Sequence, residues 1–181
     1  MQVLCARAHK TCMIDLGLGS GVNLGGVRVS AVITLSLAAR MTEAAVGRAA
    51  ELGALVSAAV VDGGGHLVHF QRMDRAEIAG PTLAVDKAFT AVAHRAATAD
   101  LTPLAVPGGP LAGLQANGGG RYVVFGGGLP CWSGDGRDDA VVVGGIGVSG
   151  GTTEQDVACA EAGLAVFDRS LIDAVEESIT P

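Results

Sequence analysis

The stretch from Thr34 to Gly53 carries apolar residues at every third or fourth position, as one face of a helix does. Thr34 is a residue type that caps helix N-termini, and Gly53 is typical of the position just beyond a helix end. An amphipathic helix is therefore predicted between them. Its apolar stripe contains Leu37, Ala38, Met41, Ala45, Ala49 and Leu52.

Two strand-like runs follow, Val56–Val61 and His66–Met73, and the segment Asp62–Gly65 separates them. Asp and Gly accept the positive φ angles of a tight turn, so the pattern predicts an antiparallel hairpin. Strict alternation along the second run would place His66, Val68, Phe70 and Arg72 on one face, and Leu67, His69, Gln71 and Met73 on the other.

A second helix is predicted from Pro81 to about Arg95, because proline suits the first helical turn. Its apolar stripe is rich in alanine, which would let it approach a sheet or a partner closely. The stripe contains Ala84, Val85, Ala88, Ala91 and Val92. A short helix is expected near Thr98–Leu104, with Thr98 as its cap.

The second half of the chain is dominated by glycine between Gly108 and Gly151, which favours tight turns and close backbone approaches. A loop is predicted over Val106–Gly120, and a turn over Ser133–Gly136. Strands are predicted at Arg121–Phe125 and, wholly buried, at Val141–Val148, followed by a helix over Thr153–Asp168. Hairpins without regular β-α-β alternation indicate an α+β fold on an antiparallel sheet.

The composition adds an expectation of self-association. Hydrophobic residues make up 49% of the 181 and charged residues 17%, so a membrane segment or a buried subunit contact should account for the excess. The longest uncharged run, 101–120, is broken by prolines and glycines and is rejected as a membrane span. A homo-oligomer without a membrane partner is therefore expected.

Charge and cysteine content narrow the partners and the compartment. A formal net charge of −6 argues against nucleic acid, which clustered basic residues would bind. The four cysteines show no CxxC spacing, which favours reduced thiols in the cytoplasm. Residues 1–30 lack the apolar core of a signal peptide and are interpreted as an extension, either disordered or an artefact of the assigned start. The predicted organisation is this extension, one domain over 31–172 and a tail over 173–181.

Five blocks in order resemble the GlcG/HbpS-like heme-binding family. They are VVDGGGHLVHFQRMD at 60–74, AVDKAFTA at 84–91, VPGGPLAGL at 106–114, FGGGLP at 125–130 and VVGGIGVSGGTTEQD at 142–156. The resemblance implies a profilin-like α+β fold with a five-stranded antiparallel sheet, helices packed around it and assembly into oligomers. It implies heme as a cofactor for some members, whereas others accompany glycolate or diol metabolism or act as enzymes. The Cys131-Trp132 pair after Pro130 departs from the family pattern, which places an aliphatic residue there.

The junction at 144–156 is the first candidate site. A glycine-rich strand leading into a helix start exposes backbone N–H groups that could bind a ligand carboxylate or phosphate. The alternative, which we favour, is that Thr152 or Thr153 caps the helix while Glu154 and Asp156 offset its dipole.

Lys87, beside Asp86, is the second candidate, as a partner for a ligand carboxylate such as a heme propionate or as a base with a lowered pKa. A structural ion pair explains it equally well. The third candidate is aromatic: Tyr122, Phe125 and Trp132 could line a cavity for a flat ligand, or simply pack in the core or at a subunit contact. Cys131 is interpreted as a buried inert thiol rather than a nucleophile. Further ligand-binding candidates are Arg72, Asn117, Gly127, Pro130 and Asp156.

Histidine spacing gives no support for a dedicated metal site, because no HxxxH, HExxH or CxxCH arrangement occurs. A single axial ligand to noncovalent heme stays open and is not identified by the sequence.

Three functions therefore remain. The leading one is a cytoplasmic oligomer that binds a small planar or acidic ligand, with heme as the inherited candidate. The second is a cofactor-independent enzyme with Lys87, His66 and Glu154 as catalytic residues. The third is a non-catalytic oligomeric partner protein.

Overall fold

The computed structural model describes residues 32–133 and 140–179 of the chain. Its elements are, in order, α1 (Leu35–Glu51), β1 (Ser57–Asp62), β2 (Leu67–Arg72), α2 (Gly80–His94), α3 (Thr98–Leu101), the 3-10 turns η1 (Thr102–Leu104) and η2 (Leu114–Ala116), β3 (Gly128–Ser133), β4 (Val141–Ser149) and α4 (Thr153–Ile179). The predicted α+β class is confirmed. Helices α1, α2 and α3 and the β1–β2 hairpin lie within a few residues of their predicted positions.

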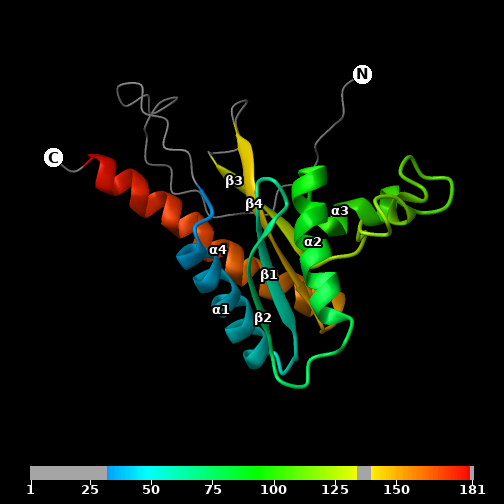
Figure 1. The fold of residues 1–181 in the computed structure, drawn as a ribbon, viewed down its shortest axis with the longest axis horizontal. Helices are drawn as coiled ribbons and strands as arrows, with labels where there is room; N and C mark the ends of the chain where they lie inside the picture. The colour runs from blue at the N-terminus through cyan, green and yellow to red at the C-terminus, as the bar shows by residue number, and fades with distance from the viewer. Residues whose placement is uncertain (1–31, 134–139, 180–181) are drawn as a thin grey trace.

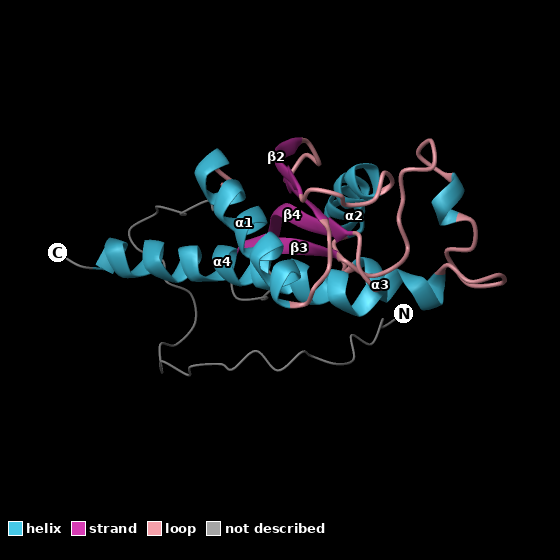
Figure 2. Ribbon diagram, turned by 90° about the horizontal axis from the view of Figure 1, so that it is seen from below, coloured by secondary structure: helices cyan, strands magenta, loops and turns pink. Residues whose placement is uncertain are grey.

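One antiparallel sheet, in the order β2-β1-β4-β3, forms the centre of the molecule (Figure 1). Helices α1 and α4 cover one face of this sheet and α2 covers the other (Figure 2). The main hydrophobic core lies between the sheet and the α1–α4 pair, with Met41, Ile146 and Phe167 fully buried in it. The sheet therefore separates two helical layers: the α1–α4 pair, which covers the main core, and the single helix α2 on the opposite face.

Glycines of β4 let α2 lie directly on the sheet. A Cβ atom at Gly147 would overlap the carbonyl oxygen of Ala84 and lie 2.5 Å from the backbone nitrogen of Ala88. A Cβ at Gly145 would lie 2.9 Å from the Ala88 carbonyl oxygen. The facing alanines of α2 are completely buried. The predicted close approach of this alanine-rich helix is thus confirmed, and β4 is its partner.

The sheet has four strands in the described part of the chain, not the five that the family resemblance implied. The predicted strand Arg121–Phe125 is wrong, because side chains take up its backbone groups. The N–H of Val123 donates to Thr90 Oγ1 at 3.0 Å, and Thr102 Oγ1 donates to the Val124 carbonyl at 2.7 Å. The strand is instead Gly128–Ser133, and its Pro130 is tolerated because β3 is an edge strand.

Other local predictions are also corrected. Ala97, not Thr98, is the N-cap residue of α3, and Thr98 Oγ1 accepts a hydrogen bond from the N–H of Gly128 at 2.9 Å. Helix α4 continues beyond the predicted end at Asp168 to Ile179. The proposed extension 1–30 and most of the turn Ser133–Gly136 lie outside the described residues, and the domain limits stay a prediction.

A β-bulge changes the faces of β2. Leu67 pairs with Val61 whereas His69 pairs with Val60, so the register slips by one residue at Val68. Leu67 and His69 therefore lie on opposite faces, contrary to the strict alternation predicted from the sequence. His69 faces α1, where its Nδ1 lies 2.8 Å from Thr42 Oγ1. The predicted placement of His66 and His69 on opposite faces of the strand is therefore wrong, because the bulge lies between them.

Within residues 32–133 and 140–179, none of the helices combines the length and the apolar character needed to cross a bilayer.

Candidate functional site

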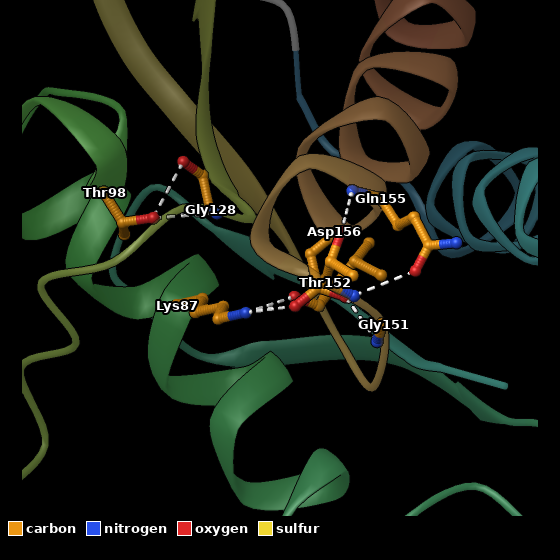
Figure 3. Close-up of polar contacts among 8 residues, drawn as sticks. Lys87, Thr98, Gly128, Gly151, Thr152, Gln155 and Asp156 are labelled. Atoms are coloured by element: carbon orange, nitrogen blue, oxygen red, sulfur yellow. Dashed lines mark hydrogen bonds and ion pairs between the residues drawn. The ribbon is translucent and has the colours of Figure 1, made fainter. Parts of the chain in front are cut away.

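Lys87 on α2 and Asp156 on α4 form a buried ion pair at the end of β4. Lys87 Nζ lies 2.7 Å from Asp156 Oδ2 and 2.8 Å from the Val148 carbonyl oxygen, to which it donates (Figure 3). The ring centroid of Phe125 lies 4.8 Å from the same nitrogen. The Lys87 side chain is completely buried, so all these contacts stay within the protein. The pair joins two helices on opposite faces of the sheet.

Glycine makes room for this pair. Gly127 has φ +116°, and a Cβ there would lie 2.8 Å from Lys87 Nζ and 3.0 Å from Asp156 Cβ. Gly128 packs against the Lys87 carbonyl group in the same way. Only a residue without a side chain adopts this backbone conformation and fits this space. The FGGGLP block is therefore the wall of the ion pair as well as the start of β3.

Burial shifts both pKa values toward the neutral forms. Desolvation lowers the pKa of Lys87, while the hydrogen bond and charge of Asp156 oppose this shift. Desolvation likewise raises the pKa of Asp156, opposed by Lys87 and by the N–H of Gly151. Each group is thus the main compensation for the buried charge of the other. A lysine with a lowered pKa could act as a general base. The Lys87 side chain, however, has no exposed surface from which to contact a substrate.

The start of α4 is capped by its own side chains, as predicted. Thr152 Oγ1 accepts from the N–H of Gln155 at 3.3 Å, and Gln155 Oε1 accepts from the N–H of Thr152 at 2.9 Å (Figure 3). Asp156 Oδ1 accepts from the N–H of Gly151 at 2.9 Å. These bonds occupy N–H groups that an incoming anion would need. Glu154 is exposed beside them, and hydrogen bonds from its own backbone and from Thr152 lower its pKa.

A second group of side chains lies on the outer surface of α2. We call it the aromatic–cation cluster; it consists of Asp86, Phe89, His94, Arg121 and Tyr122. Arg121 Nε donates to Asp86 Oδ1 at 3.0 Å, and its Cζ lies 3.6 Å from the Phe89 ring centroid. The ring centroid of Tyr122 lies 6.0 Å from that of Phe89 and, edge to face, 5.2 Å from that of His94.

Helical spacing explains the cluster. Asp86 and Phe89, three residues apart, lie on the face of α2 opposite its buried alanines, and His94 lies at the flank of the last helical turn. Buried Thr90 accepts the hydrogen bond that anchors the segment after Arg121. The Arg121 side chain is 39% exposed. Among the described residues its two terminal nitrogens have no hydrogen-bond partner. The cluster thus combines aromatic surface with an accessible cation.

The predicted site residues divide between these places. Lys87, Phe125, Gly127 and Asp156 meet at the ion pair, whereas Asp86 and Tyr122 belong to the aromatic–cation cluster.

The other predicted residues lie elsewhere. Trp132 and the buried Pro130 belong to β3, and His66 is exposed at the hairpin turn. Exposed Arg72 donates to the Ala76 carbonyl oxygen, and Asn117 Nδ2 donates to the Gly113 carbonyl oxygen at 3.3 Å. Their roles toward a ligand stay predictions.

Phe89, His94 and Arg121 were not among the candidates from the sequence. The signal that could have found Phe89 was its position three residues after Asp86, on the helix face away from the alanine stripe. His94 lies five residues after Phe89, so this spacing does not group it with them. Arg121 gave no such signal, because its contact with α2 joins segments 35 residues apart.

The buried thiols should be inert in the folded protein. Cys131 and Cys159 are both fully buried; burial raises the pKa of Cys131, and raises that of Cys159 to about 11. We therefore expect neither to react with iodoacetamide at neutral pH until urea unfolds the chain. Peptide mass spectrometry after alkylation measures this. Rapid native labelling of Cys131 would instead support a reactive cysteine.

The described residues contain no group of three or more His, Cys, Asp or Glu side chains placed to hold a metal ion.

The family model described as "Haem degrading protein HbpS-like" matches residues 33–165. The chain is 41% identical over 137 residues to an uncharacterized 15.0 kDa protein from the dhaT-dhaS intergenic region of Citrobacter freundii, covering 76% of this chain and 93% of that one. It is 40% identical over 129 residues to the corrinoid adenosyltransferase PduO of the same organism, covering 71% of this chain but only 37% of PduO.

A solved structure has the same fold. The crystal structure of a PduOC:heme complex superimposes with a TM-score of 0.69 at 36% identity, and the match covers 75% of this chain and 95% of that one.

Proposed function

The chain belongs to the HbpS-like family, and we propose that it binds heme, or a similar flat and acidic ligand, at the aromatic–cation cluster. The PduOC:heme complex supports heme as the first ligand to test. The observation that carries the proposal in this chain is the Arg121 guanidinium, stacked 3.6 Å from the Phe89 ring centroid and still 39% exposed. A cation held on an aromatic surface suits a ligand that is both flat and negatively charged.

Noncovalent heme binding needs aromatic surface, a cation for the propionates and an axial ligand, and the cluster has a candidate residue for each. Phe89 and Tyr122 supply aromatic surface, and Arg121 would pair with a propionate through its two terminal nitrogens. His94 is half-buried, and neither ring nitrogen has a hydrogen bond within the described residues, so it would serve as the axial ligand. Bound heme would supply iron whose reactivity is set by this axial ligand and by the polarity around it.

Lys87 has a supporting role in this proposal. Its ammonium is buried against Asp156 and is closed to a propionate, so it holds α2 in position rather than touching the ligand. Because the same helix carries Asp86, Phe89 and His94, the ion pair keeps the cluster in place relative to α4.

Titration with hemin tests the proposal. We expect the wild-type protein to give a saturable Soret shift at micromolar concentration, and Arg121→Ala to weaken binding about tenfold or more, since hydrogen bonds to charged groups contribute about 1.5–3 kcal/mol. His94→Ala should change the position of the Soret band and the electron paramagnetic resonance spectrum, which report the axial ligand.

Arg95→Gln is the matched control, because Arg95 is exposed next to His94 but lies outside the cluster. No saturable shift in the wild type, or equal losses in Arg95→Gln and Arg121→Ala, would remove the heme proposal.

A cofactor-independent enzyme is the competing proposal, and the lowered pKa of Lys87 supports it. It requires a substrate to reach a side chain that is now completely enclosed, with His66 and Glu154 on the exposed surface. A cytoplasmic location and assembly into a homo-oligomer complete the proposal; they rest on the cysteine spacing and the apolar composition.

A further inference from the structure

Asn117 and Gly118 form an exposed pair in the loop that follows the 3-10 turn η2. This loop projects away from the sheet beside α2 and α3 (Figure 1). Asn117 has extended backbone angles, φ −84° and ψ 168°, whereas Gly118, Gly119 and Gly120 all have positive φ angles between +58° and +84°. An asparagine side chain reacts most readily with its own backbone when glycine follows it, because glycine has no side chain to obstruct the approach.

The contacts of this pair leave the reacting atoms free. The N–H of Gly118 has no hydrogen-bond acceptor among the residues that the structure describes. Asn117 Nδ2 donates one bond, to the Gly113 carbonyl oxygen, which is long at 3.3 Å and exposed, so water competes for it. The peptide after Asn117 must rotate before its nitrogen reaches the side chain. Gly119 and Gly120 give this rotation room, because nothing lies within 4 Å of a Cβ position on either.

We propose that Asn117 deamidates spontaneously in the folded protein and that the product weakens ligand binding at the aromatic–cation cluster. The Gly118 nitrogen attacks Asn117 Cγ and gives up its proton, while the Cγ–Nδ2 bond breaks and the amide leaves as ammonia. Water then opens the cyclic succinimide, either at Cγ, which gives aspartate, or at the main-chain carbonyl carbon, which gives isoaspartate. Each product adds one negative charge to a chain whose formal net charge is −6.

Gly118 connects this chemistry to the cluster. A Cβ atom at Gly118 would lie 2.9 Å from Tyr122 Cε2, so the backbone of the pair packs directly on that ring. The Tyr122 ring in turn lies next to those of Phe89 and His94. Exposed charges interact across about 8 Å at physiological ionic strength. A new carboxylate one residue from this contact therefore repels an acidic ligand at the cluster. This effect rests on the proposed function, whereas the deamidation itself does not.

Peptide mass spectrometry of the folded protein, kept for days at physiological temperature, tests the chemistry. The peptide that contains Asn117 should gain one mass unit as ammonia is released, and part of the product should be isoaspartate. Asn23 is an internal control, because Leu24 follows it and a leucine side chain obstructs the attack. Asn117→Gln is a second control, since its longer side chain closes the ring more slowly. If Asn117 stays intact in the folded protein and reacts only in urea, the proposal is wrong.

Hemin titration tests the effect on the cluster. Asn117→Asp should bind hemin about two- to fivefold more weakly than Asn117→Gln, the usual size of one exposed charge–charge contact, and the difference should shrink at high salt. Protein aged until Asn117 has reacted should show at least the same loss relative to fresh protein. Equal affinities of the two variants, in a wild type that binds hemin, would overturn the link to the cluster. A wild type that binds no hemin would count against the heme proposal, while the mass shift at Asn117 still decides the deamidation.

Discussion

Replacing Asp156 with asparagine is expected to destabilise the fold by about 3–5 kcal/mol, the usual cost of breaking one side of a buried ion pair. The amide keeps the size of the carboxylate but leaves the Lys87 ammonium without a counter-charge, completely buried beside the Val148 carbonyl oxygen and the Phe125 ring. Urea denaturation at neutral pH measures the free energy of unfolding of the variant and the wild type.

Two further variants separate the buried charge from other effects. Replacing both partners, as Lys87→Met with Asp156→Leu, should recover most of the loss, because no unpaired charge then remains. Breaking the exposed pair of Arg48 and Glu51 with Arg48→Ala should change stability by at most about 1 kcal/mol. If Asp156→Asn has the same free energy of unfolding as the wild type, the ion pair contributes nothing to holding α2 and α4 together.

The same variant should depend on pH in a defined direction. Burial lowers the pKa of Lys87 below 10.5, the usual value for a lysine, and removing the carboxylate takes away the main group that opposes this shift. Between the lowered pKa and 10.5, the unfolded chain binds one more proton than the folded chain, so stability rises with pH. Asp156→Asn should therefore regain stability relative to wild type as the pH increases from neutral toward 10.5. A difference in unfolding free energy between Asp156→Asn and wild type that stays constant from neutral pH to 10.5 would contradict this prediction.

Introducing a single methyl group at Gly147 is expected to cost about 3 kcal/mol, at the upper end for overpacking, or to prevent folding. The new Cβ would overlap the Ala84 carbonyl oxygen and lie 2.5 Å from the backbone nitrogen of Ala88. Both obstacles are backbone atoms of α2, which cannot move aside as a side chain can. Thermal melting and soluble yield of Gly147→Ala give the measurement.

Gly47→Ala is the matched control, because this glycine lies in α1 with nothing within 4 Å of the added carbon. It should stabilise the protein by about 0.5–1 kcal/mol through helix propensity. Equal melting temperatures for Gly147→Ala and Gly47→Ala would mean that α2 does not lie in close contact with Gly147 of β4.

Both tests concern the placement of α2, on which the proposed ligand site depends. The helix is fixed to β4 through glycines and to α4 through Lys87, while its outer surface holds Asp86, Phe89 and His94. A shift of α2 would move the cluster as a unit. The two attachments therefore explain how a group of half-buried side chains at the surface keeps a defined geometry.

Elements with a clear local pattern could be predicted from the sequence. The period of apolar residues in α1, the glycine turn before β2 and the uninterrupted apolar run of β4 each follow from interactions between near neighbours. The cap of α4 follows too, because Thr152 and Gln155 lie three residues apart. The five ordered blocks likewise indicated the family, since they mark turns and close contacts that its fold requires.

Tertiary structure alone decided where β3 lies, where the register of β2 shifts at its bulge and which partners the charged residues take. Arg121–Phe125 has the composition of a strand, yet Thr90 and Thr102 bind its backbone groups from distant segments. Lys87 and Asp156 were both candidates from the sequence, but they are 69 residues apart, and nothing local pairs them. A hydrogen bond or ion pair depends on which groups meet when the layers pack, and that choice is made by the whole chain rather than by neighbours along it.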